Sequence, residues 1–142
     1  MDVYFAAPLF SQAEREFNEQ ICEMLEAAGY SVFLPQRDGF ESRDDLRAQS
    51  GIDSEEDVRR EIFRIDSAAV RDSSVVVAVL DGQVPDEGVA VEMGIAHETD
   101  RPIVGLKTDR RNPELNAMVF GTLEQMVDSP DRLTEVVDEL LA

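Results

Sequence analysis

The chain has 142 residues, a length typical of a single folded domain with a sizeable hydrophobic core. It contains 31 acidic and 13 basic residues, which gives a formal net charge of −18 at pH 7. A chain this acidic repels the phosphate backbone of nucleic acids and anionic membrane surfaces, so we expect neither as a partner.

Composition also bears on the compartment and on the solvent. No stretch approaches the ~20 apolar residues of a membrane span, and the N-terminus enters a predicted strand at once, so we expect a cytoplasmic protein without a signal peptide. The single cysteine, Cys22, falls on the apolar face of a predicted helix and is expected in the core. Because charge repulsion is screened when the Debye length is short, about 3 Å near 1 M salt, the acidity favours adaptation to high salt.

Strands and helices alternate along the chain. Capping residues mark two helix starts, Ser11 with Glu14 and Ser54 with Asp57, and Gly29 marks the end of the first helix. The apolar residues expected to face inward on the first helix are Ala13, Phe17, Ile21, Met24, Leu25 and Ala28. The predicted strands cover residues 3–5, 31–34, 75–80, 103–106 and 122–127, with a last helix after residue 129.

This alternation implies right-handed crossovers and a parallel sheet that is covered on both faces. We therefore predict one domain over residues 1–142 with a flavodoxin-like, doubly wound α/β fold of three layers and strand order 2-1-3-4-5. In this architecture ligands bind outside the carboxyl ends of the strands, near the switch point between strands one and three. Tyr4, Ala6, Asp86 and Glu92 follow from those two strands and are expected to converge there.

The most informative stretch is residues 72–96. Residues 75–80 are continuously apolar and mostly β-branched, which is typical of a strand buried on both faces. A turn leads to a predicted helix, residues 87–99, which is apolar on nearly all sides and therefore expected to be buried. Glu92 lies in its middle. Because an ionised carboxylate is costly in such surroundings unless it is paired or used, Glu92 is the first candidate for function.

A second acid, Asp66, lies on the helix that begins after Ser54. It follows Ile62 by four residues and precedes Ala69 by three, so it lies on or beside the inward stripe. On these residues alone it is more simply a boundary residue than a catalyst. Residues 36–53, before this helix, are polar and lack a clean period, which fits a mobile acidic loop and a substrate lid equally well.

Missing motifs exclude several common functions of this fold. There is no Gly-x-Gly-x-x-Gly, no Walker loop, no flavin phosphate loop after the first strand and no acid there for a receiver domain. The only histidine, His97, stands alone, which argues against a histidine-based metal site or triad. The remaining candidates are Glu92, Asp86, Asp66 and Tyr4. Such groups can act at an anomeric carbon through an oxocarbenium-like transition state, or hold a divalent metal, and spacing alone does not decide.

Three segments of the chain carry a resemblance to a known family. They read Val3-Tyr-Phe-Ala-Ala-Pro-Leu-Phe10, Asp66-x5-Asp72-Ser-Ser-Val-Val-Val-Ala-Val-Leu-Asp-Gly82 and Pro85-Asp86-x-Gly88-x3-Glu92-x-Gly94-x-Ala96. The first resembles the first strand and loop of the nucleoside 2-deoxyribosyltransferase family, and the other two resemble its core signature. Residues 108–112 and 116–118 resemble its closing loop. The similarity covers nearly the whole chain in the right order.

The resemblance implies an enzyme that transfers 2-deoxyribose between nucleobases, with 2′-deoxynucleosides and free nucleobases as partners. Glu92 would be the nucleophile, Asp66 would exchange the proton of the base, and Tyr4 would orient Glu92. Asp86 would hold a deoxyribose hydroxyl, while Asn116 would come from a neighbouring subunit. The further substrate-binding residues that the resemblance implies are Ala6, Phe10, Gly88 and Met118. No metal or organic cofactor is implied.

The sequence leaves several alternatives open. Residues 36–53 have no clear match in the family, so the sequence does not show which nucleobase the enzyme prefers. A related enzyme, a 2′-deoxynucleoside 5′-monophosphate N-glycosidase, would hydrolyse the same intermediate, but it needs phosphate ligands that the loop after the first strand does not offer. A nucleoside-binding module without chemistry is a third reading, in which Glu92 would not need to be a carboxylate.

Overall fold

The computed structural model describes residues 1–40, 44, 48 and 51–142. Within them five parallel strands form one sheet in the order β2-β1-β3-β4-β5. The strands are β1 (Val3–Ala6), β2 (Val32–Phe33), β3 (Val75–Val79), β4 (Ile103–Leu106) and β5 (Gln125–Val127). This confirms the predicted flavodoxin-like fold and its strand order.

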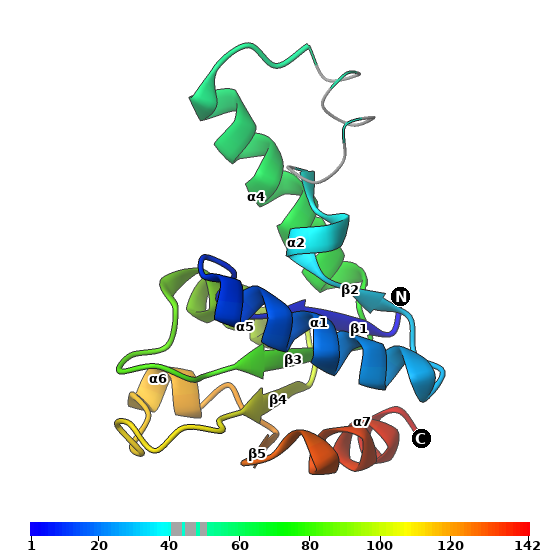
Figure 1. Cartoon of the computed structure of the whole chain (residues 1–142), viewed down its shortest axis with the longest axis vertical. Coiled ribbons are helices and arrows are strands. Elements are labelled where there is room, and N and C mark those ends of the chain that lie inside the picture. The colour runs from blue at the N-terminus through cyan, green and yellow to red at the C-terminus, as the bar shows by residue number, and fades with distance from the viewer. Residues whose placement is uncertain (41–43, 45–47, 49–50) are drawn as a thin grey trace.

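Helices cover both faces of the sheet (Figure 1). The helical elements of the described residues are α1 (Gln12–Ala27), α2 (Pro35–Asp38), α4 (Glu55–Asp72), α5 (Glu87–Glu98), α6 (Ala117–Phe120), the 3-10 turn η2 (Pro130–Arg132) and α7 (Leu133–Leu141). The side-chain clusters show that α1 and α7 pack on one face and α4 and α5 on the other. In the described part of the chain, no helix has both the length and the apolarity needed to cross a bilayer.

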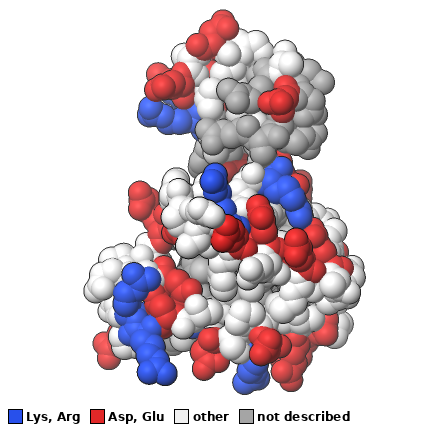
Figure 2. Space-filling model, viewed as in Figure 1, with Lys and Arg blue, Asp and Glu red and all other residues white. Residues whose placement is uncertain are grey.

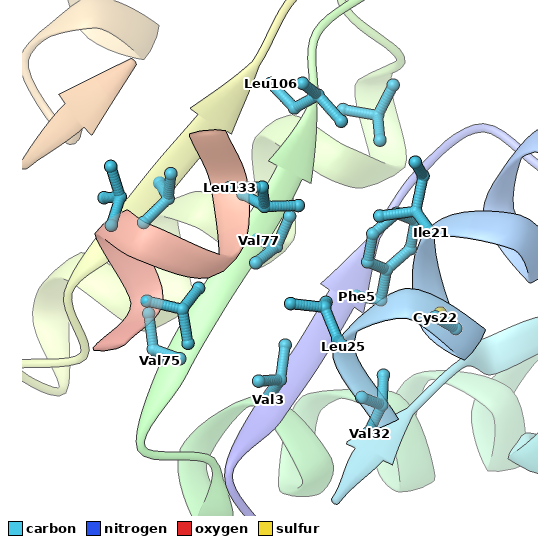
Figure 3. Close-up of a cluster of buried hydrophobic side chains, with 14 of the residues drawn as sticks. Val3, Phe5, Ile21, Cys22, Leu25, Val32, Val75, Val77, Leu106 and Leu133 are labelled. Atoms are coloured by element: carbon cyan, nitrogen blue, oxygen red, sulfur yellow. The ribbon is translucent and has the colours of Figure 1, made fainter. Parts of the chain in front are cut away.

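The strands are apolar throughout because alternate side chains enter two separate cores. On one face Val3, Phe5 and Val77 pack against Leu25 of α1 and Leu133 of α7, all fully buried (Figure 3). Cys22 is buried in the same cluster, as the sequence predicts. Burial of side chains of this size is the main favourable contribution to the stability of such a sheet, about 25 cal/mol per Å² of apolar surface.

The opposite core explains the position of a tyrosine. Tyr4, Ala6, Val76 and Ala78 alternate with the residues above and face α4 and α5. Tyr4 is fully buried, and its ring stacks on Phe33 of β2 with centroids 5.6 Å apart. The strand register therefore sends the phenol of Tyr4 toward α5.

Both predicted helix starts are present. Ser11 and Glu14 form a reciprocal capping box on α1, and Ser54 accepts a hydrogen bond from the Asp57 amide on α4. The prediction that Ala13 and Ala28 face inward on α1 is wrong, because both are exposed. Both lie at the ends of the helix, since Ala13 is in its first turn and Ala28 is its C-cap. Of the other predicted positions, Ile21 and Leu25 are buried, and Phe17 and Met24 are half-buried against the same core.

Three other expectations need correction. Residues 36–38 belong to α2 instead of a loop, because Pro35 begins a helical turn that ends at Gly39. The helix α5 is not buried on all sides, since Val91 is 55% exposed on the flank away from the sheet. The fifth strand covers only Gln125–Val127, because α6 and a turn take up the residues before it. The loop prediction for residues 41–43, 45–47 and 49–50 lies outside the described residues.

The surface carries the charge excess expected from the composition, as acidic side chains outnumber basic ones over the face in Figure 2. Several ion pairs are exposed pairs within α4, such as Arg60–Glu56 and Arg64–Glu61. Pairs of this kind contribute little to stability and do not offset the remaining repulsion.

We therefore expect the free energy of unfolding to rise with salt. Raising KCl from 0.1 M to 2 M should shorten the Debye length and increase the melting temperature, and a gain of about 1 kcal/mol would appear as roughly 4 °C. Circular dichroism melts would measure it, with a neutral osmolyte at matched osmolarity as control. A melting temperature that does not change with KCl would contradict this prediction.

Candidate active site

The centre of the candidate site is a hydrogen bond between the first strand and α5. The phenol of Tyr4 donates to Oε1 of Glu92 over 2.7 Å. Val89, Met93 and Ala96 face the sheet from α5 and are fully buried. Glu92 lies on the flank of that face, which turns its carboxylate toward Tyr4 and α4.

The surroundings of Glu92 favour its neutral form. Burial raises the pKa of its carboxyl group to about 7, and the negative charges of Asp66 and Asp86 act in the same direction, while the hydrogen bond from Tyr4 opposes them. Burial and the nearby carboxylates also raise the pKa of Tyr4 above its ordinary value. Tyr4 therefore keeps its proton and remains a hydrogen-bond donor to Glu92.

A cavity of about 300 Å³ lies between α4 and α5 in front of this pair. Glu92 and Gly88 line it from α5, and Asp66 and Ser67 line it from α4. The other walls are mainly apolar, with Ile62 and Ile95 among them. The sequence therefore predicted correctly that Asp66 lies at the edge of the inward face, and the packing of the two helices brings it to the same cavity as Glu92.

A second cavity, of about 260 Å³, adjoins the first. It is lined by Leu9 of the loop after β1, by Gly39 and Phe40 after α2, and again by Ile62 and Asp66. Asp66 and Ile62 border both cavities, so the carboxylate of Asp66 stands between two compartments. Such a site fits a ligand that is built from two parts.

Asp86 caps the helix that carries Glu92. Its Oδ2 accepts hydrogen bonds from the amides of Gly88, at 2.9 Å, and Val89, at 3.2 Å. A Cβ at Gly88 would lie 3.0 Å from that same oxygen, so a side chain there would crowd the cap. Of this predicted pair, Gly88 lines the first cavity, whereas Asp86 lines neither cavity and contacts α5 through its cap.

Other predicted residues are not brought to these cavities within one chain. Asn116 caps α6, where its Oδ1 accepts from the Met118 amide over 2.8 Å, and Met118 is 82% exposed. Phe10 is 78% exposed, and Ala6 is buried in the strand. In the part of the chain that the structure describes, none of the four lines either cavity.

Sequence reasoning missed the second cavity. Gly39 and Phe40 form its wall, and Phe40 is 2% exposed. The signal that was available is the pair Pro35 and Gly39, a proline and a glycine that start and end a helical turn. A Cβ at Gly39 would clash with the Pro35 carbonyl oxygen. Within the residues described, three or more acids, histidines or cysteines do not gather into a group that could hold a metal ion.

In doubly wound α/β domains, small molecules bind at the carboxyl ends of the strands. A carboxylate with a shifted pKa beside a cavity is typical of an active site, so the fold and the site together indicate an enzyme that acts on a small molecule. The model of the nucleoside 2-deoxyribosyltransferase family matches residues 3–131, and the chain belongs to that family. Membership supports an enzyme that acts on N-glycosidic bonds.

Solved structures share this fold. A conserved protein from Enterococcus faecalis V583 is 27% identical with a TM-score of 0.80, and the alignment covers 98% of each chain. A 2-deoxyribosyltransferase from Bacillus psychrosaccharolyticus is 20% identical with a TM-score of 0.72, over 94% of this chain and 90% of that one. A CMP N-glycosidase from Clostridium botulinum is 17% identical with a TM-score of 0.60, over 97% and 99%. Among curated proteins no match was found.

The raised pKa of Glu92 predicts that this residue costs stability. Between its ordinary pKa of 4.5 and about 7 the folded chain keeps a proton that the unfolded chain releases, so stability falls as pH rises through this window. Glu92→Gln removes the ionisation and keeps an acceptor for Tyr4. We expect it to raise the free energy of unfolding at pH 8 by on the order of 1 kcal/mol, and by less at pH 5.5.

Urea denaturation at the two pH values measures this difference. Glu98→Gln, an exposed position on the same helix, is the matched control and should show no such gain. A Glu92→Gln protein that is less stable than the unsubstituted chain at pH 8 would contradict the desolvation argument.

Proposed function

We propose that this protein transfers 2-deoxyribose between nucleobases through a covalent glycosyl–Glu92 intermediate. The observation that carries the proposal is the Tyr4–Glu92 pair, a desolvated carboxylate with one oxygen held by a phenol, which faces a divided cavity. A carboxylate of this kind suits attack on an anomeric carbon, where the transition state is cationic and the attacking charge is stabilising.

The first half-reaction uses Glu92 and Asp66. Because Tyr4 holds Oε1, we infer that Oε2 of Glu92 attacks C1′ of the deoxyribose. A bond forms between Oε2 and C1′ as the glycosidic C1′–N bond breaks, and its electron pair leaves with the base. Asp66 must begin this step protonated, and it gives that proton to the departing base. The position of Asp66 between the two compartments supports this role, with the sugar beside Glu92 and the base beyond Asp66.

The second half-reaction is the reverse with another base. A nitrogen of the incoming base attacks C1′, the ester bond to Glu92 breaks, and Asp66 accepts the proton that the base loses. Both carboxyl groups return to their starting state, so no oxidant, metal or cofactor is consumed. Attack by water instead of a base would release free deoxyribose and make the same site hydrolytic.

The remaining predicted residues take supporting roles in this proposal. Asp86 would hold a deoxyribose hydroxyl, since its cap engages Oδ2 and the residue stands at the end of the site. The small Gly88 would leave room for the sugar. Ala6, at the end of β1, and Phe10, in the loop after β1, would lie near the substrate. The whole chain, residues 1–142, would act as one catalytic domain in nucleotide salvage.

We infer that a neighbouring subunit completes the site. Asn116 and Met118 are exposed on α6 and do not line the cavities of their own chain, which fits residues offered to a partner. Large apolar side chains on the helices around the site are also exposed. They are Phe63 of α4, Val91 of α5, and Met118 and Phe120 of α6. Association of like chains would bury this apolar surface.

We favour a nucleoside over a 5′-monophosphate as substrate. A phosphate needs donors or cations, and the loop after β1 reads Ala6-Ala-Pro-Leu-Phe10, without a polar side chain. Arg111 already pairs with Asp109 at 2.8 Å. The surface charge of the chain also repels a phosphate group.

The test is a transfer assay at high salt. The protein is mixed with 2′-deoxyinosine and free adenine, and the products are separated by liquid chromatography. We expect 2′-deoxyadenosine and hypoxanthine, with the rate lowered by about 10³-fold or more in Glu92→Ala because the nucleophile is lost. Glu98→Ala, on the exposed side of the same helix, is the control.

Each alternative has its own outcome in this assay. Hypoxanthine without 2′-deoxyadenosine would indicate a hydrolase, and preference for 2′-deoxyinosine 5′-monophosphate would indicate the N-glycosidase. Ligand binding that persists in Glu92→Ala without any turnover by the unsubstituted protein would indicate a binding module.

The shared site predicts complementation between two inactive variants. Glu92→Ala supplies an intact Asn116, and Asn116→Ala supplies an intact Glu92, so co-expressed chains should form some complete sites. Random pairing gives both residues in about a quarter of the sites, whatever the size of the oligomer. Purified mixed protein should therefore recover about a quarter of the activity, and a mixture as inactive as its parents would refute a shared site.

A further inference from the structure

Two loops at the carboxyl edge of the sheet are joined by a dense set of hydrogen bonds. The first, residues 80–86, follows β3, and the second, residues 107–116, follows β4 (Figure 1). Contacts run between residues 80–83 of the first loop and residues 107–112 of the second. We call this set of contacts the clasp.

Asp81 supplies one half of the clasp. Its Oδ1 accepts hydrogen bonds from the amides of Thr108, at 2.6 Å, and Asp109, at 3.1 Å. Its Oδ2 accepts from the Thr108 hydroxyl over 2.7 Å. A single carboxylate thus fixes both the backbone and a side chain of the neighbouring loop.

Asp109 and Lys107 supply the other half. The Lys107 ammonium is buried and donates to Asp109 Oδ1 over 2.6 Å and to the Leu80 carbonyl over 3.4 Å. Asp109 Oδ2 accepts from the Gly82 amide over 2.8 Å. The hydrogen bond from Lys107, followed by that from Gly82, holds the pKa of Asp109 well below its usual range, so this carboxylate stays charged.

The backbone of both loops is adapted to these contacts. Gly82 has a φ of +117°, which disfavours any residue with a side chain, and Asn112 has a φ of +42°, in the region that asparagine tolerates. The Asn112 amide donates to the Gln83 carbonyl over 3.0 Å. Four consecutive residues of the first loop, 80–83, are therefore fixed to the second.

The far ends of the two loops carry the N-cap residues of two helices. The first loop ends at Asp86, which caps α5, and the second ends at Asn116, which caps α6. In the function proposed above, Asp86 serves the site of its own chain and Asn116 serves the site of a neighbour. The clasp joins the two segments that present them.

We propose that Asp81, Lys107 and Asp109 are positioning residues that fix Asp86 and Asn116 relative to each other. The active site of a chain and the neighbouring site that receives its Asn116 then both depend on the geometry of the same two loops. This inference rests on the proposed function for the roles of Asp86 and Asn116. The contacts themselves do not depend on it. Loosening the clasp in one chain disturbs its own sugar site and also the site that receives its Asn116.

The first experiment measures amide hydrogen exchange in Asp81→Ala. Glu98→Ala is the control, since Glu98 is exposed at the end of α5 that is far from the first loop. We expect exchange in residues 80–86 and 107–116 to become about tenfold faster in Asp81→Ala, with α1 unchanged. Asp81→Asn keeps one acceptor oxygen and should restore part of the protection. Faster exchange in the first loop alone would overturn the clasp.

The second experiment measures kinetics with 2′-deoxyinosine and adenine. Asp81→Ala should raise KM for 2′-deoxyinosine and lower kcat/KM by about tenfold, with the acidic limb of the pH profile unchanged because Glu92 and Tyr4 are untouched. Asp81→Asn should recover part of the loss. In the mixed oligomer, Asp81→Ala placed only in the Glu92→Ala chain should also lower activity, because there it can act only through the donated Asn116.

The outcomes separate this proposal from the proposed function. Full activity of the mixed oligomer with Asp81→Ala in the Glu92→Ala chain would overturn the link between sites. An unsubstituted protein that turns over no nucleoside would refute the proposed function. In that case the amide hydrogen exchange rates of the two loops would still confirm or refute the clasp.

Discussion

The candidate site depends on a carboxylate that is largely withdrawn from water. Glu92 lies on a helix that is anchored to the sheet by Met93, and its charge is opposed by burial and by two other acids. The hydrogen bond from Tyr4 is the favourable contact for the ionised form. That contact requires a tyrosine in a central strand, with its ring stacked on Phe33 and its phenol directed at α5. A side chain of β1 and a side chain of α5 thus form a polar pair inside a mainly apolar layer.

Much of the fold was predictable because local signals agreed with the final packing. The apolar run at residues 75–80 and the caps at Ser11 and Ser54 give the central strand and the starts of α1 and α4. The errors arise where tertiary context decides. The periodicity of α5 does not show that the side chain of Val91 stays exposed beside α4. The burial of Phe40 depends on tertiary contacts that cannot be predicted from the polar residues around it.

The site was predictable to a lesser degree, and for a physical reason. The costly burial of Glu92 can be inferred from its neighbours along the helix, whereas Asp66 looks like a boundary residue until α4 and α5 pack and a shared cavity forms. The Tyr4–Glu92 bond joins residues 88 positions apart, so only the family resemblance could anticipate it. In the proposed function Asn116 serves the site of a second chain. Its proposed role cannot be derived from the geometry of one.

The cap at Asp86 ties this residue to the helix that carries Glu92. Asp86 is bound to the first turn of α5, a helix of 12 residues, and Glu92 lies six residues further along, roughly 9 Å at 1.5 Å per residue. In the proposed function, a sugar hydroxyl held by Asp86 would therefore be tied to the helix that carries Glu92. The helical rise would set the distance between the two carboxylates along the axis, and the loop contacts before Asp86 would set the direction in which Asp86 points.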